Sequence, residues 1–136
     1  MRITASVRNT VSDHRVAVST DDVSQALSIG AKATGRGSGV NGGEFLVLAL
    51  ATCFCNDIYR EAARLGIPID SVEVEARADF VGVGIAARNI SYRAQVESSA
   101  PVADIEELLR QTDAVAEVQN TVRAGIEVSL SPWNKA

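Results

Sequence analysis

The sequence has few of the side chains that hold metals, disulfide frameworks or nucleic acids. Its 136 residues include one histidine and two cysteines, which is too few for a disulfide framework or a zinc site. The net charge of −4 at pH 7 gives no basic surface for a phosphate backbone. We therefore expect no metal, no cofactor and no nucleic acid, and any special chemistry must use thiol, carboxylate or guanidinium groups.

Long apolar runs are also missing. No segment reaches the roughly 18 apolar residues that a membrane span needs, and the first ten residues, MRITASVRNT, lack the apolar core of a signal peptide. We expect a cytoplasmic protein without membrane contact. The chain is 46% hydrophobic and 22% charged, with no internal repeat and no linker, so its length predicts a single domain over residues 1–136.

The first third of the sequence has the patterns of strands and a loop. Apolar and polar residues alternate over 2–9 and again over 14–20, which predicts an N-terminal hairpin, and a third short strand is expected within 26–33. The glycine-rich segment 35–43 must be a loop. It contains the G-x-G-x-x-G spacing of dinucleotide-binding loops, but no series of βαβ units accompanies it, so we interpret it as the approach to a helix.

A long helix is predicted over residues 42–65. Asn41 and Glu44 form a capping-box pair at its start, and Gly66 followed by Pro68 marks its end. The first half of this helix is apolar on all sides, which favours burial on every side. About a hundred other residues cannot easily supply that cover, so we expect a homodimer that buries this helix.

The remaining sequence completes an α+β domain. Two alternating segments joined by a glycine-containing turn predict a hairpin, and two helical patterns follow, the second capped by Asp113 and ended by Gly125. The expected elements are strands 71–80 and 89–98, a helix within 100–111, a short helix before Gly125 and a last strand 126–130. The order of elements predicts a mixed sheet packed around the long central helix.

The segment GVNGGEFLVLALATCFCNDIYREAARLGI, followed by VEVEA, resembles the central helix and next strand of the OsmC/Ohr family, the osmotically inducible and organic hydroperoxide resistance proteins. The cysteine that follows a G-x-N-x-x-E-x-L helix start is the specific part, and the order of the other elements agrees. The resemblance implies an intertwined homodimer with active sites at the subunit interface. It also implies that a cysteine on the central helix, Cys53 here, reduces organic hydroperoxides.

The resemblance further implies partners for that thiol, and here the sequence departs from the family. The family's resolving cysteine falls at about Ala116, and no cysteine follows Cys55. The family's catalytic glutamate falls on Gly43, while Glu44 lies one residue, or about 100° of helix rotation, further on. The arginine that assists the thiolate corresponds to Arg15 or Arg36, and both remain candidates.

The neighbours of Cys53 on the helix suggest its substrate. An apolar pocket there would favour an organic hydroperoxide over hydrogen peroxide; its expected residues are Phe45, Leu46, Leu50 and Phe54. Cys55 lies two residues from Cys53, so the two side chains diverge by about 200° and a disulfide would require local unwinding. We expect Cys55 to pack in the core and an external thiol to reduce oxidised Cys53.

Two functions follow from these observations. The first is a thiol-dependent reduction of organic hydroperoxides at Cys53, in defence against oxidative stress, with Arg15 or Arg36 stabilising the thiolate and Glu44 orienting the arginine. The alternative is a non-catalytic OsmC-like homodimer that binds an apolar small molecule at the subunit interface. A thiolate needs a neighbouring positive charge, because an ordinary cysteine is mostly protonated at neutral pH. The charges around the Cys53 sulfur therefore discriminate between the two functions.

Overall fold

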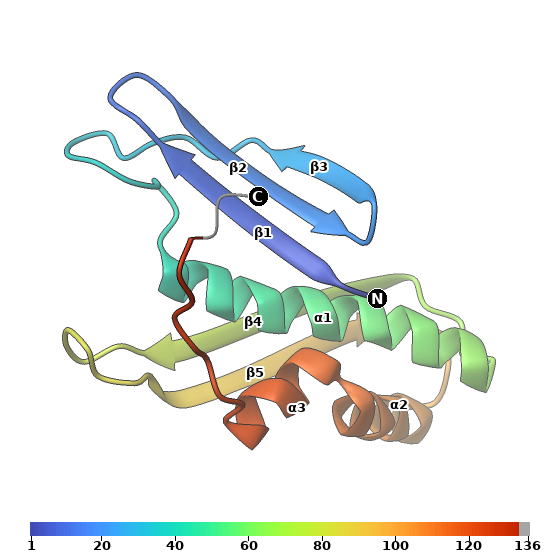
Figure 1. Ribbon diagram of the computed structural model, residues 1–136. Coiled ribbons are helices and arrows are strands. Elements are labelled where there is room, and N and C mark those ends of the chain that lie inside the picture. Colours follow the sequence, from blue (N-terminus) through green and yellow to red (C-terminus); the bar gives the residue numbers. More distant parts are fainter. Residues whose placement is uncertain (134–136) are drawn as a thin grey trace. The chain divides into compact units, whose positions relative to one another are not determined.

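The computed structural model describes residues 1–133, which fall into two compact units (Figure 1). The first unit comprises residues Met1–Phe45, and the second begins at Leu46. The first contains one antiparallel sheet and the start of the long helix. The second contains the rest of that helix, an antiparallel hairpin and two shorter helices. The single domain predicted from the length stays a prediction.

The sheet of the first unit has the order β1-β2-β3 (Figure 1). Its strands are β1 (Ile3–Asn9), β2 (His14–Thr20) and β3 (Val23–Leu27). The predicted hairpin of the first two strands is confirmed. The third strand begins earlier than predicted, because Thr20 pairs with Val23 across a two-residue turn. Asp21 has a φ of 50° in this turn, a left-handed conformation that aspartate tolerates.

The glycine-rich loop after β3 folds back on itself. The backbone N–H of Gly39 donates to the carbonyl of Gly30 over 2.8 Å, and that of Lys32 donates to the carbonyl of Gly37 over 2.9 Å. A Cβ on Gly39 would lie 3.0 Å from the Gly30 oxygen. This close backbone approach requires glycine and explains one of the glycines in the loop without any phosphate.

Helix α1 (Gly42–Leu65) has the predicted limits. Asn41 Oδ1 accepts a hydrogen bond of 2.9 Å from the backbone N–H of Glu44, and Glu44 Oε2 accepts one of 2.8 Å from the backbone N–H of Asn41. This reciprocal pair is the predicted capping box, and it satisfies two donors at the helix start. At the other end, Gly66 adopts a φ of 69°, which stops the helix.

In the second unit, α1 packs on one face of a two-stranded sheet. Strands β4 (Ser71–Asp79) and β5 (Arg88–Glu97) pair antiparallel, and their apolar residues alternate with exposed polar ones as predicted. Helices α2 (Val102–Val115) and α3 (Glu117–Ala124) follow (Figure 1). The core lies between the inner face of the sheet and the helices; its buried members are Phe54, Ile58, Ala62, Leu108 and Ala116.

The predicted mixed sheet is wrong. The described residues form two separate sheets, of three and two strands, and every pairing in them is antiparallel. The physical reason is that the strands within each sheet are joined by connections too short for a parallel pair, while the long crossover through α1 leads from β3 to a separate sheet. The α+β class itself is confirmed.

Two predictions for the last third of the chain are also wrong. Asp113 does not cap the second helix but lies inside α2, where Arg123 holds its carboxylate at 2.6 Å, and α3 starts after Ala116. The segment 126–130 forms no strand within the part of the chain that the structure describes. Its apolar side chains are exposed, because no sheet edge of the described residues pairs with it.

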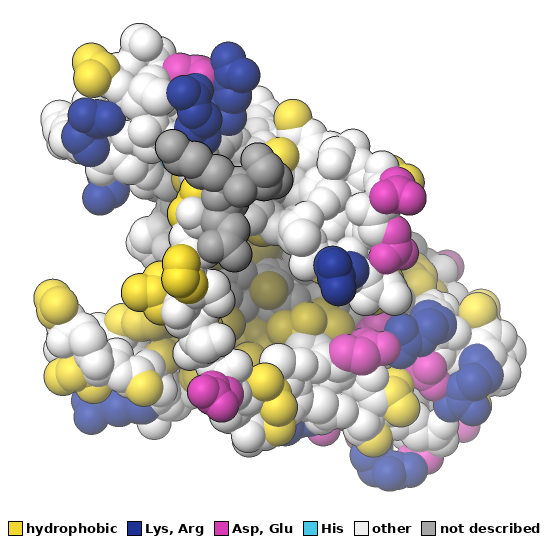
Figure 2. Space-filling view, in the orientation of Figure 1, with side chains coloured by type: hydrophobic (Ala, Val, Ile, Leu, Met, Phe, Trp, Pro, Cys, Tyr) yellow, Lys and Arg dark blue, Asp and Glu magenta, His cyan; other side chains and the backbone are white. Residues whose placement is uncertain are grey.

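The surface of the second unit has a charged region and a hydrophobic region. Basic and acidic side chains intermix over α2 and the C-terminal end of α1, whereas hydrophobic ones cover the tip of the β4–β5 hairpin (Figure 2). Val83 in that tip is fully exposed. Burial of α1 on every side is not observed within this chain, since Leu48 in its apolar half is 56% exposed.

Replacing Ile58 with alanine tests this description of the core. Ile58 is fully buried, so Ile58→Ala should lower the free energy of unfolding by about 2–5 kcal/mol. The exposed Ile85 provides the matched control, and Ile85→Ala should change that free energy by about 0.5 kcal/mol or less. Urea unfolding of both variants measures the difference. Equal losses would contradict the placement of Ile58 in the core.

Candidate functional site

Cys53 lies in the middle of α1, at the edge of the core of the second unit. Its side chain is half-buried and packs against the core cluster. The thiol donates a hydrogen bond to Asp57 Oδ2, one helical turn further along, with a sulfur–oxygen distance of 3.6 Å. Glu117 Oε2, from the first turn of α3, lies 4.0 Å from the same sulfur. Among the described residues of this unit, the charged groups that contact the thiol are therefore two carboxylates.

Arg60 binds both of these carboxylates. Its Nη1 lies 2.8 Å from Asp57 Oδ1 and 3.7 Å from Glu117 Oε1, and its Nε lies 3.4 Å from Glu61 Oε1. The two oxygens of Asp57 thus have different partners, the guanidinium on Oδ1 and the thiol on Oδ2. Arg60 compensates the charge of the cluster and fixes the orientation of the Asp57 carboxylate.

The surroundings of Cys53 favour the protonated thiol. Burial raises its pKa above the ordinary value, and the charges of Asp57 and Glu117 raise the pKa further. The backbone N–H of Val118, which donates to the sulfur, acts in the opposite direction. Burial also raises the pKa of Asp57, and the charge of Glu117 adds to this, while Arg60 lowers it. The raised pKa and the hydrogen bond to Asp57 therefore favour the thiol over a preformed thiolate.

The sulfur and the two carboxylates are also potential metal ligands. One ligand atom from each of Cys53, Asp57 and Glu117 lies within 4.8 Å of the others. Arg60 already pairs with both carboxylates through their other oxygens, Asp57 Oδ1 and Glu117 Oε1. Sequence reasoning missed this cluster because Glu117 is 64 residues away from Cys53, and no local pattern connects them.

The predicted partners of the thiolate lie in the first unit. Arg15 forms an ion pair of 2.6 Å with Asp13, and Arg36 Nε donates to Asn9 Oδ1 over 3.4 Å. Glu44 makes the capping hydrogen bonds described above. The catalytic roles of Arg15, Arg36 and Glu44 therefore stay predictions.

The second cysteine has a different environment. Cys55 is a free, half-buried thiol two residues further along α1, and the helix is unbroken between the two cysteines. On a regular helix their side chains point about 200° apart. Ala116, at the position where the resemblance places a resolving cysteine, is fully buried at the junction of α2 and α3.

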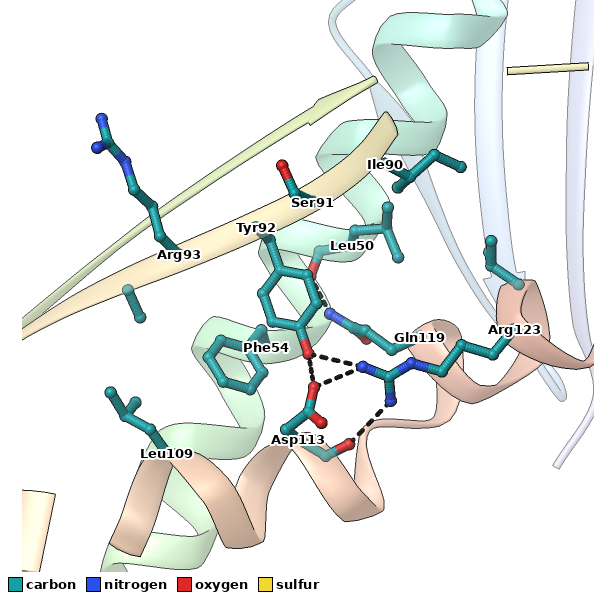
Figure 3. Close-up of a pocket in the computed structure, with 12 residues that line it drawn as sticks. Leu50, Phe54, Ile90, Ser91, Tyr92, Arg93, Leu109, Asp113, Gln119 and Arg123 are labelled. Carbon is teal, nitrogen blue, oxygen red and sulfur yellow. Dashed lines mark hydrogen bonds and ion pairs between the residues drawn. The ribbon is translucent and has the colours of Figure 1, made fainter. Parts of the chain in front are cut away.

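An open cavity of about 610 Å³ lies between α1, β5, α2 and α3 (Figure 3). Leu50 and Phe54, two of the four residues predicted to form an apolar pocket, line it; the other two, Phe45 and Leu46, do not, nor does Cys53. Three polar side chains lie at one end of this cavity, where Arg123 binds the carboxylate of Asp113, and the Tyr92 hydroxyl donates to that carboxylate.

A buried glutamine joins the wall of this cavity to α1. Gln119 Nε2 donates to the backbone carbonyl of Leu50 over 2.8 Å (Figure 3), while its Oε1 is buried without a hydrogen-bond partner among the described residues. Buried polar atoms are nearly always paired, so this side chain has a specific role in fixing α3 on α1. The helical pattern of α3 gave no signal of it, because glutamine usually lies on the exposed face of a helix.

Comparison with known proteins identifies the family. The family model described as OsmC-like protein matches residues 35–131. This match covers more than half of the chain, and the chain belongs to the OsmC-like family. No curated protein matches the sequence. Among the described residues, no helix combines the length and apolar character needed to cross a membrane.

Solved structures agree with this fold. An OsmC-like protein from Mycoplasma pneumoniae is similar, with a TM-score of 0.64 and 19% identity over 90% of this chain and 86% of that one. An organic hydroperoxide resistance protein OsmC from Legionella pneumophila has a TM-score of 0.57 and 15% identity, over 88% and 89% of the two chains. A putative organic hydroperoxide resistance protein from Vibrio cholerae, with captopril in one of its active sites, has a TM-score of 0.56 and 17% identity, over 91% and 87%.

The acidic surroundings of Cys53 predict a weakly acidic thiol. In a Cys55→Ser background, thiolate absorbance should show a pKa for Cys53 above that of a free cysteine. Glu117→Gln should lower this pKa, because the substitution removes a negative charge 4.0 Å from the sulfur. Glu106→Gln, on the exposed surface of α2, should leave it unchanged. A Cys53 pKa at or below that of free cysteine would contradict the described site.

Proposed function

We propose that this protein reduces organic hydroperoxides with the Cys53 thiol, in defence against oxidative stress. The observation that carries the proposal is a free, half-buried thiol on the central helix with a carboxylate acceptor at 3.6 Å. Membership of the OsmC-like family supports it, as do the names of two structural neighbours, which are called hydroperoxide resistance proteins.

In the proposed reaction the sulfur attacks the outer oxygen of the hydroperoxide and the O–O bond breaks. Cys53 becomes a sulfenic acid, and the rest of the peroxide leaves as an alcohol that takes up the thiol proton. An external thiol then forms a mixed disulfide with Cys53 and releases water. A second external thiol releases Cys53 and restores the reduced protein. The cycle needs no second cysteine of this chain, in agreement with the divergent direction of Cys55.

The other predicted residues have roles in the same proposal. Arg15 or Arg36 stabilises the negative charge that develops on the sulfur, and Glu44 orients that arginine. The apolar residues Phe45, Leu46, Leu50 and Phe54 favour a substrate with a hydrocarbon part. Leu50 and Phe54 support this assignment, because both line a largely apolar cavity next to the helix that carries the thiol.

The proposal includes a homodimer. Large hydrophobic side chains are exposed on α1, at the β4–β5 hairpin and in the C-terminal segment; Leu48, Val83, Val128 and Leu130 are examples. Soluble monomers rarely expose so many, and a second copy of the chain would cover them.

The cavity supports a second candidate function, the binding of an apolar small molecule without catalysis. Its wall combines Leu50 and Phe54 with a paired Arg123 and Asp113 at one end, a combination of apolar surface and few polar groups that is typical of ligand sites. In this alternative Cys53 is a small buried side chain that packs at the edge of the core.

The rate of oxidation by cumene hydroperoxide distinguishes the two candidates. We expect Cys53 to form a sulfenic acid, seen as a mass increase of the intact protein, faster than free cysteine does under the same conditions. The fast phase should disappear in Cys53→Ser and remain in Cys55→Ser, which is the matched control. Oxidation no faster than that of free cysteine would overturn the peroxidase proposal and leave the binding function.

The oligomeric state can be measured independently of activity. The chain has a mass of 14.3 kDa, and light scattering during gel filtration should give twice this mass. Leu48→Asp should shift the equilibrium toward the monomer, because it places a charge within an apolar contact surface, whereas Asp104→Asn on α2 should not. A mass of one chain at all concentrations tested would contradict the dimer.

A further inference from the structure

The carboxylate of Asp57 is fixed on both of its oxygens. Asp57 is buried on α1, with Oδ1 held by Arg60 at 2.8 Å and Oδ2 at 3.6 Å from the Cys53 sulfur. The regular helix sets the spacing of the thiol and the carboxylate, which are four residues apart. Arg60 is in turn held by Glu61, so the carboxylate cannot easily rotate away from the thiol.

We propose that Asp57 is a catalytic residue that accepts the Cys53 proton through Oδ2 during attack on the peroxide, with Arg60 as the residue that positions it. This inference rests on the proposed peroxidase function and assigns to that function a proton acceptor. Glu117 has a different role, because it is exposed and its oxygen is farther from the sulfur, at 4.0 Å. Its charge raises the pKa of the thiol without an equivalent path for the proton.

The proton transfer balances the chemistry of the first step. As the sulfur forms its bond to the outer peroxide oxygen, the S–H bond breaks and its proton moves to Asp57 Oδ2. The O–O bond breaks at the same time, and the alkoxide that leaves takes the proton back from Asp57. Sulfur loses two electrons and the peroxide gains two, so this step needs no other oxidant or reductant. The carboxylate ends in its starting state, as a general acid–base group must.

The charges around Asp57 suit this role. On α1 itself it faces the guanidinium of Arg60 and the thiol, and from α3 it faces the carboxylate of Glu117. Burial and Glu117 raise the pKa of Asp57, which makes the carboxylate a better proton acceptor than an ordinary aspartate. Arg60 opposes this shift, because its positive charge favours the ionised carboxylate.

The variant Asp57→Asn separates proton transfer from simple electrostatics. Asparagine keeps the shape but cannot accept a proton, so oxidation of Cys53 by cumene hydroperoxide at neutral pH should slow by about 100-fold. If Asp57 acted only through its charge, the same variant would lower the pKa of the thiol and oxidation would become faster. The two hypotheses therefore predict changes of opposite sign. Asp104→Asn, an exposed substitution of the same kind on α2, is the matched control.

Three further readouts complete the experiment in the Cys55→Ser background. Asp57→Glu should recover part of the lost rate, because it restores a proton acceptor. The rates of the parent protein and Asp57→Asn should converge at alkaline pH, where the thiol is already ionised. Glu117→Gln should not cause the loss of rate that Asp57→Asn causes, because it leaves the acceptor in place. An unchanged or faster rate for Asp57→Asn would overturn the assignment of Asp57.

One measurement needs no substitution at Asp57. If the proton moves during the attack, oxidation of the parent protein should be slower in D2O than in H2O at matched acidity. A rate that is not slower in D2O would overturn the inference even if Asp57→Asn failed to fold. Fast oxidation of the parent protein together with this result would leave the peroxidase function intact. Slow oxidation of the parent protein itself would remove the function and the inference together.

Discussion

The four-residue repeat along α1 is the constraint on which the site depends. Phe54, Ile58 and Ala62 form one stripe of the helix, and their burial against the β4–β5 sheet and α2 fixes its rotation. Cys53 and Asp57 each precede a member of this stripe by one residue, so both lie at its margin, where Cys53 is half-buried and Asp57 is buried. The thiol and its carboxylate neighbour are therefore positioned by the packing of apolar side chains that take no part in the chemistry.

The electrostatics at this margin set the kind of reaction that the thiol can perform. A guanidinium in contact with sulfur would stabilise a thiolate before the peroxide arrives. In the second unit the guanidinium of Arg60 contacts Asp57 and Glu117 instead, and the sulfur meets the carboxylates. A thiol that is protonated at rest has to lose its proton during the reaction. A fixed proton acceptor then raises the rate of attack more than a nearby positive charge does.

The sequence predicted those features that depend on local signals. The limits of α1 follow from the capping box of Asn41 and Glu44 and from Gly66, all within a turn of the helix ends. The resemblance located Cys53, but the acidic cluster around it depends on a contact between α1 and α3 that no local pattern encodes. The strand predicted for 126–130 was wrong for a related reason. An alternating pattern indicates only a preference for a strand, whereas a strand also needs a neighbouring strand to pair with.

One buried residue at the junction of α2 and α3 positions two groups that shift the pKa of the Cys53 thiol in opposite directions. Ala116 is fully buried and extended, so the chain turns there and α3 starts directly beside Cys53. The N–H of Val118 is one of the donors that a helix start leaves unpaired, and it donates to the sulfur. Glu117 occupies the same first turn, where the helix dipole stabilises its negative charge. Of these two groups, the N–H of Val118 has the larger effect on the pKa of the thiol, and it lowers that pKa while Glu117 raises it.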